Sequence, residues 1–266
     1  MRSGDAAFGD EALVQMRWRD ALFAHWETDP ETVAGRLPPG VEVATFDGHA
    51  WLGVVAFVME DIRPCGVPFG LSFPELNLRT YVTRSVDDAE RSEDDTERSG
   101  DGAEASSTGH RTQSGDSARA VYFFNLDADD RLGVALARLL YSLPYYRADM
   151  RVRSGADESI EFASQRTHWN APPAHFDATY EPVGDDFTPE PGTLEHFFVE
   201  NYRFYTVGRR LYYGDISHPP WPLYEANAEI RSNTLFAANG FETPTDEPVV
   251  HYSPGIEVTA GRIHRA

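Results

Sequence analysis

Short runs of alternating apolar and polar residues, separated by turn signals, recur along almost the whole chain and constrain its fold more than any other feature. The clearest pair is VEVATF and HAWLGVVAFVME, which Asp47 and Gly48 join as a tight hairpin turn would. Further runs predict strands at Arg17 to Trp26, Leu76 to Thr83, Ala120 to Asp127, Ala148 to Arg153, Ser159 to Arg166, Phe176 to Pro182, Arg209 to Ser217, Leu223 to Arg231 and His251 to Ile263. About ten strands at such short spacing favour a closed barrel or a sandwich over alternating βα units.

Three helices are expected beside these strands, so the fold class is mainly β with a minor α component. The first begins at Asp29, a capping residue that a proline follows, and stops at Leu37-Pro38-Pro39-Gly40. The second is expected from about Asp130 to Leu143, where leucines form one apolar stripe before Pro144. The third begins at Thr193, and the side chains on or near one of its faces are interpreted as core: Leu194, Phe197, Phe198, Tyr202 and Tyr205.

One segment departs from this pattern. From Arg84 to Arg119 the chain has almost no apolar residue and is rich in Asp, Glu, Ser and Gly, so it cannot bury enough surface to fold. Because it separates two strands that are expected to be neighbours, we interpret residues 84–119 as a disordered acidic insertion at a hairpin tip. The chain as a whole has the length of a single domain, residues 1–266.

The charged residues are unusual in kind as well as in number. All 23 basic residues are arginine, and 43 acidic residues leave a formal net charge of -20. These biases resemble the halophilic proteins of salt-accumulating archaea, because about 1 M salt shortens the Debye length to about 3 Å and screens the repulsion between surface carboxylates. So negative a chain repels phosphate backbones and anionic lipid, and neither nucleic acid nor a membrane surface is expected as a partner.

A cytoplasmic location is expected from two further features. No apolar run approaches the roughly 18 to 20 residues that span a bilayer, and the N-terminal segment lacks a secretion signal. The single cysteine, Cys65, rules out an internal disulfide and fits a reducing compartment.

The absence of lysine excludes several kinds of chemistry. Imine-forming enzymes, pyridoxal phosphate enzymes and phosphate loops of the GxxxxGK type all need a lysine amine. The run from Gly70 to Pro74 lacks the last glycine of a GxSxG elbow. The nine histidines are scattered, without an HxH or HExxH spacing. We therefore expect neither a cofactor nor a metal.

Several sequence blocks carry a family resemblance: WRDALFAHW from Trp18, LPPGVEVATFDGHAWLGVVAF from Leu37, FPELNLRTYV from Phe73, VYFFNLDADD from Val121, ARLLYSLPYYRADM from Ala137, LEHFFVENYRFYTV from Leu194, HPPW from His218 and HYSPGIEV from His251. Together they resemble the YqjF-like family of uncharacterised proteins. The resemblance implies a cupped, closed antiparallel β-barrel similar to that of acetoacetate decarboxylase, with about three flanking helices, and no established activity. The decarboxylase works through a lysine imine, so any reaction of this chain uses other groups.

The best candidate site lies on the expected strand ELNLRTYV, where four polar side chains share one face: Glu75, Asn77, Arg79 and Tyr81. If this face points into the barrel cavity, Arg79 clamps a carboxylate or enolate oxygen and Asn77 donates to a carbonyl. Glu75, with its pKa raised by burial, then acts as a general acid or base. The alternative is an ordinary half-exposed strand whose polar groups are solvated.

Other polar residues in the recognised blocks are candidates for the same cavity: Arg138, Tyr145, Tyr146, Arg166, Tyr202 and His218. For each of them a structural hydrogen bond or cation–π contact is the competing interpretation. Two functions remain open, namely a lysine-independent enzyme acting on a small oxo or carboxylic acid and a noncatalytic module that binds a small, anionic ligand. A structural protein with a filled barrel is a third alternative, and the sequence does not predict the oligomeric state.

Overall fold

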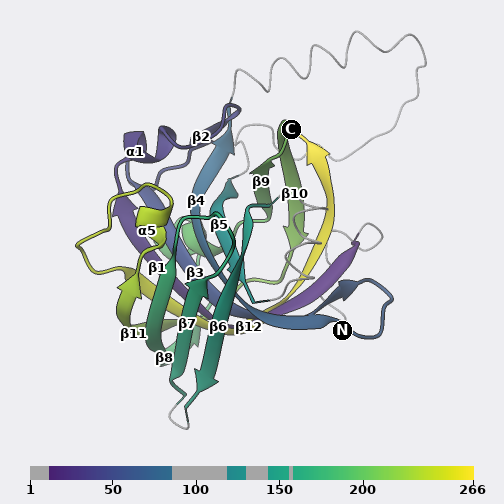
Figure 1. Cartoon of the computed structure of the whole chain (residues 1–266), viewed down its shortest axis with the longest axis vertical. Helices are drawn as coiled ribbons and strands as arrows, with labels where there is room; N and C mark the ends of the chain where they lie inside the picture. The colour runs from purple at the N-terminus through teal and green to yellow at the C-terminus, as the bar shows by residue number, and fades with distance from the viewer. Residues whose placement is uncertain (1–11, 86–118, 130–142, 156–157) are drawn as a thin grey trace.

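The computed structural model of this chain describes residues 12–85, 119–129, 143–155 and 158–266. Within these residues twelve strands hydrogen-bond into one sheet (Figure 1). In chain order the elements are β1 (Val14–Thr28), α1 (Pro30–Ala34), β2 (Val41–Val43), β3 (Ala50–Pro64), β4 (Leu71–Arg84), β5 (Ala120–Ala128), β6 (Tyr145–Ser154), β7 (Ile160–Arg166), β8 (His175–Phe187), α4 (Leu194–Val199), β9 (Arg203–Val207), β10 (Leu211–Ser217), β11 (Leu223–Asn233), α5 (Leu235–Ala238) and β12 (Val249–Arg265).

The sheet branches at β5 and β12 and closes on itself twice. β12, β1, β3, β4 and β5 pair in that order and form a common wall. β9 and β10 connect β5 to the C-terminal half of β12 and close a ring of seven strands. β6, β7, β8 and β11 connect the same two strands on the other side (Figure 1). The predicted closed, mainly β fold is confirmed, although β5 pairs in parallel with β6 and β9.

Bulges in β1 and β3 decide which side chains reach the interior of the seven-stranded ring. Asp20 and Asp61 have positive φ values of 54° and 52°, and the pairing register shifts near both. Side chains alternate between the two faces of a strand, so one extra residue exchanges the faces. In β1 the inward series accordingly passes from even positions such as Met16 to odd positions such as Phe23.

Both faces of β4 are buried. Leu76 and Leu78 pack into a hydrophobic cluster between the common wall and the β7–β8 side. The opposite face points into the seven-stranded ring, where Glu75, Asn77 and Arg79 are only 3%, 2% and 8% exposed. The interpretation of this strand as half-exposed, with solvated polar groups, is therefore wrong, because a second layer of strands covers the apolar face.

The first helix begins as predicted. The Asp29 carboxylate accepts a hydrogen bond from the backbone nitrogen of Thr32 at 2.9 Å, and Pro30 occupies the first turn. The helix ends at Ala34, slightly before the predicted stop at Leu37.

The third helix is shorter than predicted. α4 ends at Val199, because the Asn201 side chain donates to the carbonyl oxygens of Phe197 and Phe198 at 3.0 and 3.2 Å. The chain then enters β9, whose aromatic and β-branched residues favour an extended strand. The prediction that Tyr205 continues the helix is wrong, and β9 itself was not predicted.

Two predicted segments lie almost entirely outside the described residues: the helix from Asp130 to Leu143, of which only Leu143 is described, and the acidic insertion, 84–119. The strands on either side of the insertion pair as a hairpin requires, with Val82 opposite Ala120. None of the helices in the described residues has the length or apolar character needed to cross a membrane.

Candidate functional site

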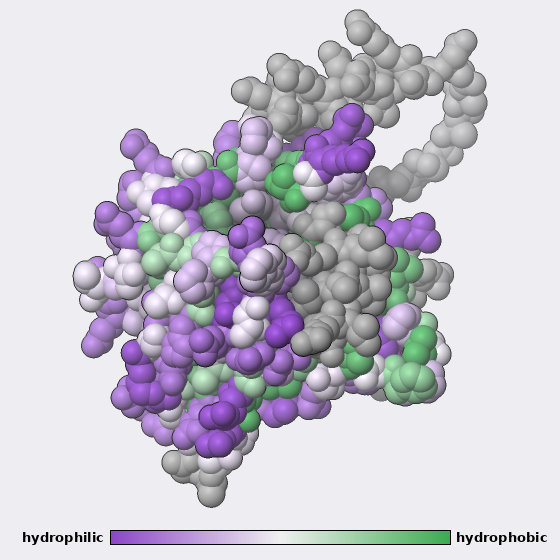
Figure 2. Space-filling view, in the orientation of Figure 1, coloured by the Kyte–Doolittle hydropathy of each residue, from purple (hydrophilic) through white to green (hydrophobic). Residues whose placement is uncertain are grey.

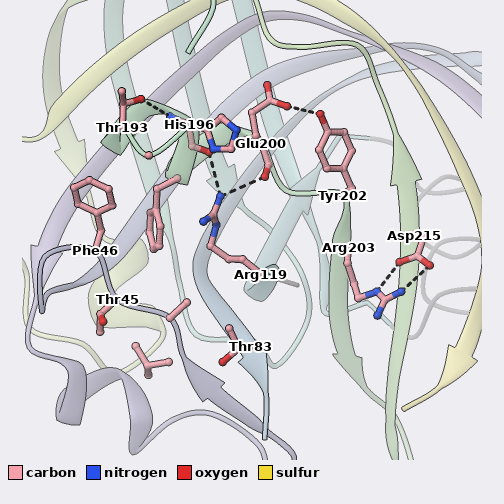
Figure 3. A pocket seen from close by; sticks show the side chains of 14 residues that line it. Thr45, Phe46, Thr83, Arg119, Thr193, His196, Glu200, Tyr202, Arg203 and Asp215 are labelled. Atoms are coloured by element: carbon pink, nitrogen blue, oxygen red, sulfur yellow. Dashed lines mark hydrogen bonds and ion pairs between the residues drawn. The ribbon is translucent and has the colours of Figure 1, made fainter. Parts of the chain in front are cut away.

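Two hollows in the described part of the protein are candidates for the functional site. The larger, of about 760 Å³, is a groove between α4, the β2 end of the sheet and β9–β10 (Figure 3). Its charged side chains are paired with one another or with backbone: Arg203 with Asp215 at 2.6 and 3.0 Å, and Arg119 with the amide oxygen of Asn201 at 2.9 Å and with the carbonyl oxygens at the end of α4. Among the described residues of this groove, no buried polar atom lacks a partner.

The smaller hollow is a cavity of about 210 Å³ inside the seven-stranded ring. Most of its lining is apolar or aromatic, and its polar groups include Glu75, Arg79, Tyr145 and His218, which were predicted from the sequence. A largely apolar cavity with a few convergent polar groups is typical of a small-molecule site. We therefore take this cavity, and not the groove, as the candidate site.

Glu75 is a buried carboxyl group with an unusual titration. The Tyr145 hydroxyl donates to Glu75 Oε2 at 2.6 Å. Removal from water raises the pKa of Glu75 to about 7, although the hydrogen bonds from Tyr145 and Asn77 act in the opposite direction. A group with a pKa near neutrality can both accept and release a proton under ordinary conditions.

Arg79 is buried and has no acidic partner among the described residues. Its Nη2 donates to the Phe198 carbonyl oxygen at 3.1 Å and lies 3.4 Å from the Tyr81 hydroxyl, while its Nε has no hydrogen-bond partner. No carboxylate in the described part of the chain forms an ion pair with it. Among the described residues, the charge of this buried guanidinium is therefore not compensated by a carboxylate, which is costly in free energy.

Tyr81, His25 and Arg79 belong to one hydrogen-bonded group at the Phe198 carbonyl. The Tyr81 hydroxyl donates to the Phe198 carbonyl oxygen at 3.0 Å, so His25 Nε2, 2.6 Å from the hydroxyl, is the donor in that contact. Burial, with smaller contributions from Arg79 and another histidine, holds the pKa of His25 well below its usual value, so the ring is neutral. A Cβ atom at Gly53 would lie 2.7 Å from this ring, so the close approach requires glycine there.

The other predicted residues have different outcomes. Arg166 and Tyr146 line neither hollow, because Arg166 forms an ion pair with Asp127 at 2.8 Å and lies over the Tyr146 ring. His218 lines the cavity and donates from Nδ1 to the Pro219 carbonyl oxygen at 2.8 Å, and burial lowers its pKa. Tyr202 stacks on His218 at 4.5 Å but is 43% exposed and lines the groove. Asn77 and Tyr81 are buried beside the cavity, and Asn77 Oδ1 has no partner. Arg138 lies outside the described residues.

The sequence did not predict that His25 and the Phe198 carbonyl belong to the site. His25 lies after the bulge in β1, so simple alternation from Trp18 places it on the wrong face. The sequence carries no signal for His25, because the bulge is marked by the positive φ at Asp20, which no alternation pattern reveals. The described residues contain no group of three His, Cys, Asp or Glu side chains arranged to hold a metal.

Comparison with known proteins places the chain in a family. Residues 15–92 and 108–257 match DUF2071, described as "Uncharacterized conserved protein". The chain belongs to the DUF2071 family. This DUF2071 protein is 36% identical over 245 residues to "Uncharacterized protein YqjF" of Bacillus subtilis (strain 168), covering 91% of this chain and 87% of that protein. The YqjF-like resemblance is thereby confirmed.

Solved structures share the fold of the DUF2071 chain at low sequence identity. The enduracididine biosynthesis enzyme MppR complexed with pyruvate matches with a TM-score of 0.60 and 10% identity, over 99% of this chain and 93% of that one. An acetoacetate decarboxylase-like enzyme from Sphingomonas wittichii RW1 gives 0.58 and 14%, over 100% and 97%. Acetoacetate decarboxylase from Legionella pneumophila gives 0.55 and 11%, over 96% and 88%. The acetoacetate decarboxylase-like fold is thus confirmed, and at this identity the likeness extends to the fold alone.

Proposed function

We propose that this protein is a lysine-independent enzyme that binds a small oxo or carboxylic acid in its cavity and transfers a proton at a carbon next to the carbonyl. The observation that carries the proposal is that one buried cavity is lined by both Glu75 and Arg79. Glu75 has a pKa of about 7, and Arg79 has no carboxylate partner among the described residues. The first is suited to proton transfer and the second to an anion.

In the proposed reaction each group has one role. Arg79 holds the carboxylate of the acid, or the oxygen on which negative charge develops. The Glu75 carboxylate takes a proton from the carbon next to the carbonyl, and the electron pair of that C–H bond moves toward the carbonyl oxygen to give an enolate. Return of the proton from Glu75 to the same carbon completes an exchange. In the alternative reaction of a 3-oxo acid, the C–C bond to the carboxylate breaks without prior removal of a proton, CO2 leaves, the electron pair of that bond gives the enolate, and protonated Glu75 donates its proton to the carbon.

Oxo acids are the first compounds to test. A structure of MppR, which shares this fold, contains pyruvate, and that fact supports the choice of compounds without assigning the same ligand here. A thermal-shift screen of small carboxylic and oxo acids at high salt, followed by calorimetry and product analysis on the best compound, tests the proposal. Binding without turnover would favour the second candidate function, a noncatalytic binding module. The hydrogen bond from Tyr145 to Glu75 is compatible with that function too, because it holds the carboxyl group in place whether or not a proton is transferred.

Tyr145→Phe is expected to raise the pKa of Glu75 above about 7, because it removes a hydrogen bond that favours the ionised carboxylate. The pH at which activity depends on Glu75 should move upward, while activity at the new optimum persists. Tyr202→Phe is the matched control, since Tyr202 also donates to a carboxylate, that of Glu200, but in the groove. A pH–rate profile that is unchanged in Tyr145→Phe would contradict a role of Tyr145 in setting this pKa.

We also propose a salt-rich, cytoplasmic setting, an archaeal halophile as the source, and no nucleic-acid or membrane partner. The surplus of carboxylates supports all of these, and Figure 2 shows a face on which hydrophilic residues predominate. Because screening removes the repulsion among these carboxylates, the melting temperature should be higher in about 2 M KCl than in about 0.1 M KCl. Equal melting temperatures in the two solutions would remove the halophile interpretation.

A further inference from the structure

Glu75 and Arg79 lie at two different levels of the cavity. They are four residues apart on β4, and both line the cavity. At about 3.3 Å per residue their Cα atoms are about 13 Å apart along the strand. An acid that is bound at one of them must therefore be long enough to reach the other.

The guanidinium of Arg79 is bonded to groups on the side away from Glu75. Its Nη2 donates to the Phe198 carbonyl oxygen and lies 3.4 Å from the hydroxyl of Tyr81, two residues further along β4. The pKa of Glu75 is shifted by the charge of Asp127 and not by that of Arg79. Since an opposite charge within about 4 to 6 Å would lower the pKa of a carboxyl group, the two side chains do not approach each other that closely.

The lining between these two levels is apolar. Asn77, midway between them, does not line the cavity, whereas Leu126 opposite it on β5 does. Phe123 lies opposite Arg79, and the ring of Phe23 lies 5.5 Å from the guanidinium carbon. A chain of methylene groups is favoured here, because polar atoms would lose their hydration without compensation.

Trp18 offers a hydrogen-bond donor at the level of Glu75. Its ring lines the cavity and lies 5.3 Å from that of Phe57, the residue opposite Glu75 on β3. Its Nε1 is buried and has no hydrogen-bond partner in the described part of the chain. A buried indole N–H usually donates to an acceptor, and the carbonyl oxygen of a ligand beside Glu75 would provide one.

The gap between the two ends sets the position of the reacting carbon. Of the roughly 13 Å along the strand, a hydrogen bond at Arg79 takes about 2.9 Å and a C–H contact at Glu75 takes about 3 to 3.5 Å. The acid itself must span about 7 Å, or about five bonds, since a C–C bond of about 1.5 Å advances an extended chain by about 1.3 Å. Five bonds from a carboxylate oxygen lead to carbon 5, whereas the reacting carbon 3 of a 2-oxo acid is only three bonds away.

We propose that the substrate is a 4-oxo acid, bound with its carboxylate at Arg79, its carbonyl oxygen at Trp18 and carbon 5 at Glu75. This inference rests on the proposed function and specifies its substrate class. The Glu75 carboxylate takes a proton from carbon 5, and the electron pair of that C–H bond moves to the carbonyl oxygen, so that an enolate forms. Return of the proton completes an exchange. Decarboxylation of a 3-oxo acid does not fit, because the carbon that receives the proton there is next to the carboxylate.

Exchange in D2O, followed by proton NMR on the wild-type protein at high salt, tests the substrate class with two isomers. After subtraction of the rate without protein, 4-oxopentanoate should exchange at carbon 5 roughly tenfold or more faster than 2-oxopentanoate does at carbon 3, because misplacement by a few ångström is costly. Pentan-2-one, which has a methyl group in place of the carboxylate of 4-oxopentanoate, should exchange roughly tenfold or more slowly than that acid, because it has no charged partner for Arg79.

The outcomes separate this inference from the proposed function. Equal or faster exchange of 2-oxopentanoate, or equal exchange of pentan-2-one, would overturn the 4-oxo acid and leave proton transfer in the cavity standing. Exchange of neither isomer would overturn the proton transfer as well, and calorimetry on the same samples would then show whether the acids still bind.

A pair of variants tests the position of the carbonyl group. Trp18→Phe removes the indole N–H and keeps an aromatic ring, so the exchange of 4-oxopentanoate should fall about tenfold, because a hydrogen bond to the carbonyl oxygen strengthens as negative charge develops there. Its dissociation constant should change less than this. Trp169→Phe makes the same replacement at a residue that is 91% exposed and lines neither hollow, and it should change neither quantity. Equal exchange rates in the two variants would overturn the placement of the carbonyl oxygen at Trp18.

Discussion

Replacement of Arg79 by methionine is expected to weaken the binding of small carboxylic acids more than tenfold. A hydrogen-bonded pair with a charged group contributes about 1.5 to 3 kcal/mol, and each 1.4 kcal/mol is a factor of ten in affinity. Methionine keeps an apolar stem of similar length in the cavity. The Phe198 carbonyl that loses Arg79 still accepts from Tyr81 and Asn201, so folding should persist.

Arg231→Met is the matched control for this measurement. Arg231 lies on β11, is partly exposed, and forms an ion pair with Asp177 away from the cavity. Its replacement should leave the dissociation constant unchanged in calorimetry. If Arg79→Met and the wild type bind the best acid of the screen equally well, Arg79 is not the carboxylate clamp.

Glu75→Gln is expected to reduce turnover by a factor of about 10² to 10⁴, the usual contribution of a general acid or base. The amide keeps the shape of the side chain but cannot exchange a proton, so the affinity for the acid should remain within a few fold. Product analysis and calorimetry on the same preparation separate the two effects. Unchanged turnover would leave the Arg79 clamp standing and remove the acid–base role of Glu75.

The same variant tests the titration of Glu75 without any ligand. The pKa of this carboxyl is raised from 4.5 to about 7 by burial, so the folded state binds its proton more tightly than the unfolded state does. The associated stability is complete below about pH 4.5 and is lost as the pH rises to about 7, a difference of about 3 kcal/mol at 1.36 kcal/mol per unit. Glu75→Gln should therefore gain stability relative to wild type between pH 5 and pH 8.

Denaturant unfolding at these two pH values measures the gain. Glu229→Gln, at a carboxylate whose side chain is 77% exposed, should show no such difference. If Glu75→Gln behaves like Glu229→Gln, the pKa of Glu75 is not raised.

The sequence predicted that one face of β4 is polar, but it did not predict whether this face points into the ring or toward solvent. Alternation places Glu75 and Arg79 on one face of a strand, and in an ordinary two-layer sheet the polar face would meet water. Here Leu76 and Leu78 pack against a second layer, so both faces are buried and the polar one meets the cavity. That layer consists of strands distant in sequence, and the pattern of one strand contains no information about it.

Local deviations explain what was missed elsewhere. The bulge at Asp20 reverses the faces of β1, so His25 reaches Tyr81 although alternation from Trp18 places it on the other side. Aromatic residues after Thr193 fit one face of a helix, yet the Asn201 side chain ends the helix by hydrogen-bonding its carbonyls. In both cases a single polar residue outweighs a regular pattern.

The pairing of β1 with β12 has a consequence for synthesis. Val14 lies opposite Ala260, so strands from the two ends of the described chain are neighbours in the wall that carries the cavity. The ring around Glu75 and Arg79 cannot close until the ribosome has released β12. Such distant pairings slow folding. Arg79 and Glu75 of the nascent chain therefore remain in water until β12 has been synthesised and paired, and only then does burial change their chemistry.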